Sequence, residues 1–107
     1  GTIVSQVFPY ERSLGAPIVK EAHDLLQARG GAEVTPAMLE GFSAAKVLVE
    51  GLRRAGKELS RAGLQRALEG MRRVDIGGLE VSYGPDDHTG LDYAELSIVG
   101  ADGRFKR

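Results

Sequence analysis

The sequence has no cysteine and no tryptophan, and only 6% of its 107 residues are aromatic. Without cysteine the chain can form no disulfide, no thiolate metal site and no cysteine nucleophile. The compartment stays open, because chains without cysteine occur both in the cytosol and in the bacterial periplasm. Long hydrophobic runs are absent too. No apolar segment approaches the roughly 20 residues that a membrane-spanning helix needs, so we expect no membrane insertion.

No charge of one sign dominates. The chain carries 14 Lys and Arg residues against 15 Asp and Glu residues, a formal net charge of −1. Such a balance gives no attraction to nucleic acid, so we expect no nucleic-acid partner. The pairs Arg53–Arg54 and Arg72–Arg73 lie at the ends of predicted helices and are interpreted as solvated helix edges. With 42% hydrophobic and 27% charged residues, the composition is that of a globular domain.

The most informative segment runs from Leu39 to Gly56, LEGFSAAKVLVEGLRRAG. It predicts one helix whose apolar face is wider than that of an isolated surface helix. Two neighbouring apolar stripes make up this face, one formed by Phe42, Ala45, Val49 and Leu52, the other by Met38, Leu48 and Ala55. Its wet edge offers Lys46–Glu50 and Glu50–Arg54 as i,i+4 ion pairs. A helix of this kind needs cover on more than one side, which favours a layered α/β architecture.

Periodicity and turn residues predict the remaining elements. Strands are expected over residues 2–8, 79–83 and 93–99, helices over residues 16–29, 36–55 and 61–71, a turn over residues 84–90 and a frayed tail over residues 104–107. The order β-α-α-α-β-β gives few strands for three helices, so the sheet within residues 1–107 is predicted to be incomplete. The chain also begins at Gly1 rather than at a methionine. We therefore expect a single segment, trimmed or excised from a larger protein.

Candidate catalytic and metal-binding residues are weak. Asp86, Asp87 and His88 are adjacent, but neighbours in a tight turn point apart, so the aspartates are expected to bond their own backbone rather than a metal ion. His23 is expected on a solvated helix face. No glycine-rich phosphate loop and no nucleophile elbow is present; the GFSAA around Ser43 has alanine where that motif needs a second glycine. The sequence therefore predicts neither an enzyme nor a cofactor.

Three aromatic residues, Phe8, Tyr10 and Tyr93, lie at the ends of predicted strands. Ligand clefts of α/β sheets form at such ends, where aromatic rings can stack on a ligand. The same rings can also pack beneath a loop, which is the interpretation we favour without a structure. The residues alone leave both interpretations open.

An ordered series of landmarks resembles the C-terminal part of type I periplasmic binding proteins, most of all the branched-chain amino-acid receptors of ABC importers. The landmarks are Gly41–Phe42, Ala55–Gly56, Ala67–Leu68, Gly77–Gly78, Pro85–Asp86–Asp87, Gly90 and Asp102–Gly103–Arg104–Phe105. The resemblance implies a two-lobed, hinged receptor that closes on a small molecule. Two of the three strands that connect its lobes would lie near Ile3–Phe8 and Tyr93–Ile98.

The same resemblance implies the ligand-binding residues. The ligand would meet Phe8 and Tyr10, and a pocket wall would fall near Ala37 and Met38. Relatives often have an aromatic residue at that wall, and its absence here argues against a branched-chain amino acid. Most residues that clamp the ligand's amino and carboxylate groups would lie in a preceding part of the protein. The present chain alone is therefore expected to bind the ligand poorly.

The implied function is the solute-binding component of an ABC importer. It would bind an amino acid or a small organic acid, work with an ABC permease, and lie in the periplasm or, lipid-anchored, outside a Gram-positive cell. Two alternatives stay open. One is a small interaction module that forms a homodimer through its open strand edge. The other is the ligand-sensing domain of a regulator with the same fold.

Overall fold

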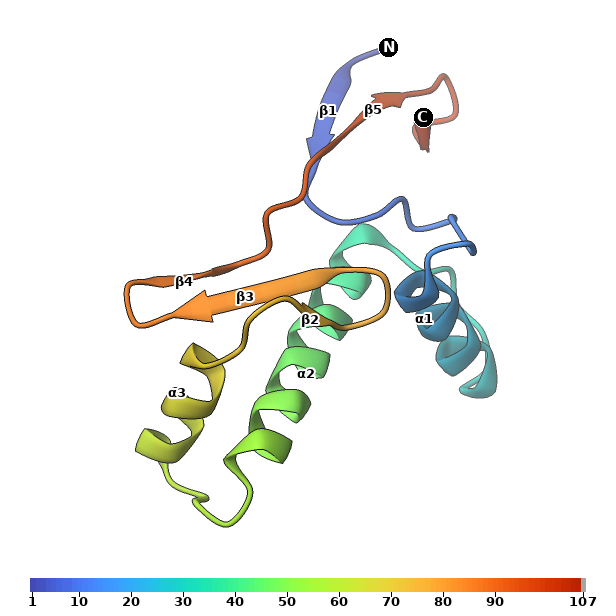
Figure 1. Ribbon diagram of the computed structural model, residues 1–107. Helices are drawn as coiled ribbons and strands as arrows, with labels where there is room; N and C mark the ends of the chain where they lie inside the picture. The colour runs from blue at the N-terminus through green and yellow to red at the C-terminus, as the bar shows by residue number, and fades with distance from the viewer. Residues whose placement is uncertain (107) are drawn as a thin grey trace.

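The computed structural model describes residues 1–106 and contains three helices among six short strands (Figure 1). Along the chain the elements are β1 (Ile3–Gln6), α1 (Pro17–Ala28), α2 (Pro36–Ala55), α3 (Arg61–Glu69), β2 (Val74–Asp75), β3 (Glu80–Gly84), β4 (Asp87–Gly90), β5 (Glu95–Val99) and β6 (Phe105–Lys106). No helix within residues 1–106 combines the length and the apolar character that crossing a membrane requires.

The three helices begin where the sequence predicts them. Helices α1 and α2 each start with a proline, whose fixed φ suits the first helical position. The Thr35 hydroxyl accepts the Met38 N–H at 3.2 Å, and the Ser60 hydroxyl accepts the Gly63 N–H at 3.0 Å. These caps satisfy N–H groups that the first helical turn leaves unpaired.

Three strands and one helix end differ from the sequence-based prediction. Helix α3 stops at Glu69, so Met71 is a buried residue of the following loop rather than of the helix. Residues 84–90, expected to be a turn, form the tip of a hairpin and all of β4, while β2 and β6 were not predicted. Strands of two to four residues are too short to show an alternating pattern, and their pairing depends on partners elsewhere in the chain.

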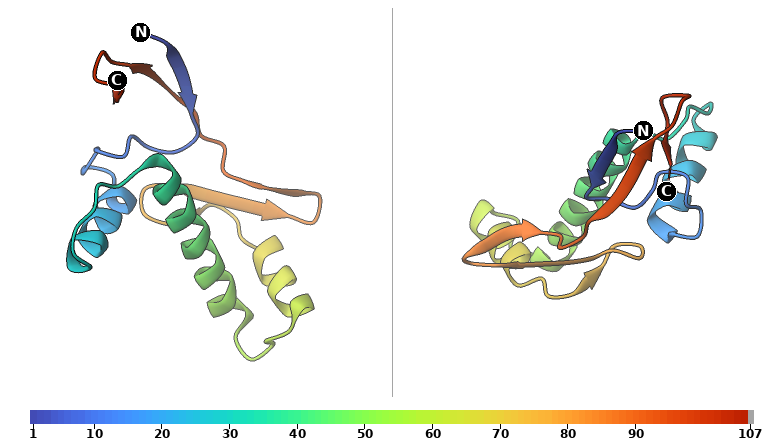
Figure 2. Two further views of the ribbon diagram at one scale, coloured as in Figure 1. Left: turned by 180° about the vertical axis from the view of Figure 1, so that it is seen from behind. Right: turned by 90° about the horizontal axis from the view of Figure 1, so that it is seen from above.

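The strands form two separate antiparallel sheets. Strands β1, β5 and β6 form the terminal sheet, in the order β1-β5-β6, and β2, β3 and β4 form the second. The second sheet lies with α1, α2 and α3 in what we call the helical body. Figures 1 and 2 show the terminal sheet set apart from the helical body, with the chain passing between them twice, through residues 7–16 and 91–94. The strands expected to connect two lobes are thus paired with each other, Ile3 opposite Ile98 and Gln6 opposite Glu95.

The core lies in the helical body, between the hairpin and the helices. Its buried members are Ile18, Val19, Leu39, Met71, Ile76, Leu79 and Val81. Helices α2 and α3 approach closely at Gly51, where an added Cβ would lie 2.6 Å from Leu68 Cδ2. Leu68 therefore occupies the space that any other residue at this position would fill.

A large apolar surface stays uncovered among the described residues. The Cα radius of gyration is 15.8 Å, against about 13 Å for a compact domain of this length. The accessible surface is 7143 Å², against about 5,800 Å² for a monomeric protein of this mass. Exposed large apolar residues are Ile3, Val7, Leu14, Leu25, Met38, Leu48, Val49, Leu52, Leu59, Leu96 and Ile98. The wide apolar face predicted for the long helix is therefore only partly covered.

One predicted ion pair differs. Lys46 pairs with Glu21 of α1 instead of with Glu50, and its Nζ lies 5.6 Å from the centroid of the Phe42 ring. Glu50 instead pairs with Arg53 at 3.0 Å and, as predicted, with Arg54 at 2.9 Å. Lys46 pairs with Glu21 on α1 rather than with Glu50 on its own helix, because the packing of α1 beside α2 brings Glu21 within reach.

Candidate functional site

The terminal sheet meets the helical body at a small cavity of about 170 Å³, which we call the junction cleft. It is lined by Glu11, Arg12, Glu33, Val34, Thr35, Pro36, Gly103, Arg104 and Phe105. Three parts of the chain converge there: the first connection between the two bodies, the start of α2 and the turn before β6. Any movement of one body relative to the other would change the shape of this cleft.

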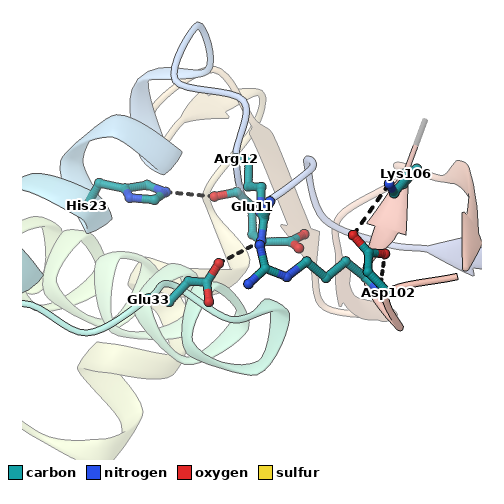
Figure 3. A network of polar contacts seen from close by, with 7 residues as sticks. Glu11, Arg12, His23, Glu33, Asp102 and Lys106 are labelled. Atoms are coloured by element: carbon teal, nitrogen blue, oxygen red, sulfur yellow. Dashed lines mark hydrogen bonds and ion pairs between the residues drawn. The ribbon is translucent and has the colours of Figure 1, made fainter. Parts of the chain in front are cut away.

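The loop of the first connection is fixed to the helical body by two polar contacts (Figure 3). Arg12 Nη2 lies 2.6 Å from Glu33 Oε1, just before the start of α2. His23 Nε2, on α1, lies 2.7 Å from the Glu11 carbonyl oxygen. His23 is half-buried, which corrects the prediction of a solvated helix face. Sequence alone could not show this, because the partner is a backbone atom 12 positions away.

The opposite wall is a tight turn that places Arg104. Asp102 Oδ1 accepts the Arg104 N–H at 3.1 Å, and its other oxygen lies 3.4 Å from Lys106 Nζ. These bonds lower the pKa of the Asp102 carboxyl, the Arg104 N–H contributing most. Figure 3 shows Asp102 and Lys106 across from the Arg12–Glu33 pair. The turn is held at its base while the Arg104 side chain lines the cleft.

The charges of the cleft come in two signs. Arg12 and Glu33 neutralise each other. Arg104 and Glu11 line the same cavity and form no ion pair with any side chain in residues 1–106. A guanidinium can hold a carboxylate through two parallel hydrogen bonds, and a carboxylate can hold an ammonium group. The cleft thus offers complementary charges to a small acid or zwitterion.

Of the four ligand contacts inferred from sequence, Phe8 and Met38 line cavities beside α2, and Tyr10 and Ala37 line none of the cavities described for residues 1–106. Phe8 is half-buried against the core and lines a second cavity, beside Glu40 and Ser43. Met38 is exposed and lines a groove between α1 and α2. Tyr10 directly precedes Glu11 and Arg12, and Ala37 directly follows Pro36, so these two adjoin the junction cleft in sequence. Sequence reasoning did not predict the charged residues of the junction cleft, Glu11, Arg12, Glu33 and Arg104. Asp102–Gly103 was visible in the sequence as a turn signal, but it did not show that the turn places Arg104 in a cleft.

In the acidic segment before His88, Asp87 makes the local backbone bond expected of it. Asp87 Oδ1 accepts the Thr89 N–H at 3.0 Å and the Thr89 hydroxyl at 2.6 Å, and these two bonds lower the pKa of Asp87. His88 instead contacts Glu69 of α3 at 3.0 Å. Within residues 1–106 no three His, Cys, Asp or Glu side chains converge as a metal site would require. Ser43 is buried and donates its hydroxyl to the Leu39 carbonyl at 2.8 Å, as a helix-interior serine does.

No family model and no curated protein matches the sequence. Solved structures do match. A periplasmic substrate-binding protein from Ralstonia solanacearum is 33% identical, with a TM-score of 0.83 over 96% of this chain and 30% of its own. An extracellular ligand-binding receptor from Verminephrobacter eiseniae is 25% identical, with a TM-score of 0.84 over 100% of this chain and 31% of its own. A possible leucine/isoleucine/valine-binding protein from Rhodopirellula baltica is 28% identical, with a TM-score of 0.86 over 100% of this chain and 30% of its own.

These similarities confirm the resemblance drawn from the landmark series and the expected incomplete α/β architecture. All three proteins are binding proteins or receptors. The present chain spans about 30% of each of them. It therefore has the fold of one part of a type I periplasmic binding protein.

Proposed function

We propose that this chain is the C-terminal portion of a two-lobed solute-binding protein of an ABC importer, which binds an amino acid or a related small organic acid between its lobes. On this proposal, the helical body belongs to one lobe and the terminal sheet to the other. The two connections, residues 7–16 and 91–94, would act as hinges. The protein would act outside the cytoplasm, deliver its ligand to an ABC permease and catalyse no reaction.

The observation that carries the ligand class is the pair of opposite charges in the junction cleft, Arg104 and Glu11, which form no ion pair within residues 1–106. Arg104 would hold the carboxylate of the ligand and Glu11 its ammonium group where it has one. Phe8, Tyr10, Ala37 and Met38 stay as proposed ligand contacts. Tyr10 and Ala37 fit this cleft best, because their sequence neighbours line it.

The test is calorimetric titration of the intact protein with amino acids, small aromatic acids and their amides. We expect binding of at least one amino acid or acid, and weaker binding of its amide. Arg104→Gln should weaken that binding about tenfold or more, since charge-assisted hydrogen bonds are roughly twice as strong as neutral ones. Lys57→Gln removes the same charge from the loop after α2 and should have no effect. Absence of binding across all three classes would count against the proposal.

A second candidate, a self-associating interaction module, is favoured by the terminal sheet. Ile3 pairs with Ile98, and Leu96 lies two positions away on the same face. Ile3 and Leu96 are 68% and 70% exposed, and β1 is an outer strand of its sheet. An apolar face beside an open edge can pair with a second copy. A monomeric 107-residue protein would count against this candidate, and a monomeric intact protein that binds a small ligand would favour the receptor.

A further inference from the structure

A further cavity lies on another side of α2, between α3 and the β3–β4 hairpin. Its volume is about 410 Å³, within the range of roughly 300–1,000 Å³ usual for small-molecule sites. We call it the α3 pocket. Its lining residues are Val47, Arg61, Leu64, Gln65, Leu68, Glu69, Tyr83 and His88. None of them lines the junction cleft, so the two cavities are separate sites.

The walls of the α3 pocket are apolar. Val47 comes from α2, Leu64 and Leu68 from α3, and Tyr83 from β3. Gly51 allows the Leu68 side chain to pack directly against the α2 backbone. An apolar group in this pocket would leave water for contact with aliphatic side chains and an aromatic ring.

One carboxylate stands at the border of this apolar space. The Glu69 side chain is 18% exposed. Its Oε1 lies 3.0 Å from Gln65 Nε2 and 3.0 Å from His88 Nε2. These hydrogen bonds, Gln65 first and His88 second, lower the pKa of Glu69 and keep it ionised. Glu69 Oε2 has no hydrogen-bond partner among residues 1–106, so the fixed carboxylate has one oxygen available to a donor.

The rim indicates that the pocket opens to solvent. Arg61 and Gln65 are exposed on the same helix, and Arg66 forms an exposed ion pair with Glu58 at 2.6 Å. Covering this face with another protein layer would remove several charged groups from water at a large cost. Arg61 lies eight residues before Glu69, about 12 Å along the helix axis. The anionic end of the pocket is therefore well separated from Arg61, the arginine of α3 that lines the pocket.

We infer that the α3 pocket binds a small organic cation: an ammonium group on an apolar, preferably aromatic, body. The ammonium group would donate to Glu69 Oε2, and the body would lie among Leu64, Leu68 and the ring of Tyr83. This inference is independent of the proposed ligand of the junction cleft.

The experiment titrates the intact, isotope-labelled protein with three probes of similar shape, followed by amide and methyl chemical shifts. The probes are phenethylammonium, 2-phenylethanol and 3-phenylpropanoate. We expect the cation to bind at least tenfold more tightly than the anion, with the alcohol between them. Shifts should concentrate at Leu64, Leu68 and Tyr83. Equal affinity for the three probes, or shifts centred on Arg12 and Arg104, would overturn the inference.

Two carboxylate variants make the test specific. Glu69→Gln should weaken phenethylammonium binding about tenfold, because it removes the charge and keeps the shape. Glu58→Gln removes an equal charge from a side chain that is 70% exposed and outside the pocket, and should leave the affinity within twofold. Equal effects of both variants would overturn the inference. If Glu69→Gln does not fold, the affinity order of the three probes on the unsubstituted protein still decides the question.

Discussion

At the scale of single residues, one carboxylate holds a turn onto the first helix. Asp75 Oδ1 accepts the N–H groups of Gly77 and Gly78 at 2.8 and 2.6 Å. Both glycines have positive φ, 120° and 87°, a conformation that other residues rarely adopt. The Gly77 carbonyl in turn accepts the Ile18 N–H at 2.8 Å, at the start of α1. The turn therefore joins the hairpin to α1 and completes the first turn of that helix.

These bonds make the stability of the turn depend on pH. The Gly77 N–H, followed by the Gly78 N–H, lowers the pKa of Asp75 below its ordinary 3.8. A lowered folded-state pKa contributes stability that is present above pH 3.8 and is lost as pH falls toward that lower value. We expect Asp75→Asn to lower the melting temperature at pH 7, and the difference from the unsubstituted protein to shrink steadily below pH 4. Thermal unfolding monitored by circular dichroism between pH 2.5 and 7 measures both.

The control for this prediction is Asp24→Asn. Among residues 1–106, the ion pair of Asp24 is with the Lys20 side chain, at 2.7 Å, and both side chains are more than 60% exposed. Exposed pairs of this kind contribute little to stability. A loss of melting temperature at pH 7 as large for Asp24→Asn as for Asp75→Asn would contradict the role given to the Asp75 turn.

At the scale of elements, two glycines within α2 have opposite surroundings. Gly41 is exposed, and nothing lies within 4 Å of an added Cβ. Gly51 is buried, and an added Cβ would lie 2.6 Å from Leu68 Cδ2 and 3.2 Å from Leu64 Cδ1. The helix would prefer alanine at both positions, but the contact with α3 permits it at only one. The close packing of α3 against α2 therefore explains why α2 has glycine at position 51, although glycine lowers the stability of a helix.

We expect Gly41→Ala to raise the free energy of unfolding by about 0.5–1 kcal/mol, the difference in helix propensity. Gly51→Ala should instead lower it by about 1–2 kcal/mol, because overpacking outweighs that gain. Urea denaturation of the two variants gives both values. The pair is its own control, since the chemical change is identical. Stabilisation by both substitutions would show that α3 shifts without cost.

At the scale of the whole molecule, two small bodies share two connections and leave apolar surface in contact with water. The excess of surface over a compact monomer is roughly 1,300 Å², more than the roughly 800 Å² that each partner contributes to a standard protein–protein interface. In the proposed receptor, other parts of the protein would cover these faces. Where those parts are missing, a second copy of the chain can cover the same apolar faces.

We therefore expect the 107-residue protein to associate at micromolar concentrations through the terminal sheet. The double variant Leu96→Lys, Ile98→Lys should weaken this association at least tenfold, because lysine side chains on that face would have to leave water. Sedimentation velocity over a range of concentrations measures it. Leu59→Lys, at a loop position that is 75% exposed, is the matched control and should change nothing. A monomer at all concentrations would contradict both this prediction and the interaction-module candidate.

The sequence by itself determined the helices, because their signals are local. Thr35 and Ser60 cap the first turns, prolines occupy first helical positions, and Gly56 ends α2 within one residue of the predicted limit. The landmark series also identified the fold family, since those turns and helix ends recur in a fixed order. Phe8, Tyr10, Ala37 and Met38 come from that same series as proposed ligand contacts and stay predictions.

Only the tertiary structure decided which distant residues meet. The short strands β2, β4 and β6 form only by hydrogen bonding to neighbouring strands, so no local sequence pattern predicted them. Lys46 forms an ion pair with Glu21 on another helix, and Arg12 forms one with Glu33. Both partners lie more than 20 positions away in the sequence. The junction cleft joins residues 11 and 104, nearly the whole length of the chain apart. Spacing along a sequence cannot predict such encounters, because they depend on how already formed elements pack against one another.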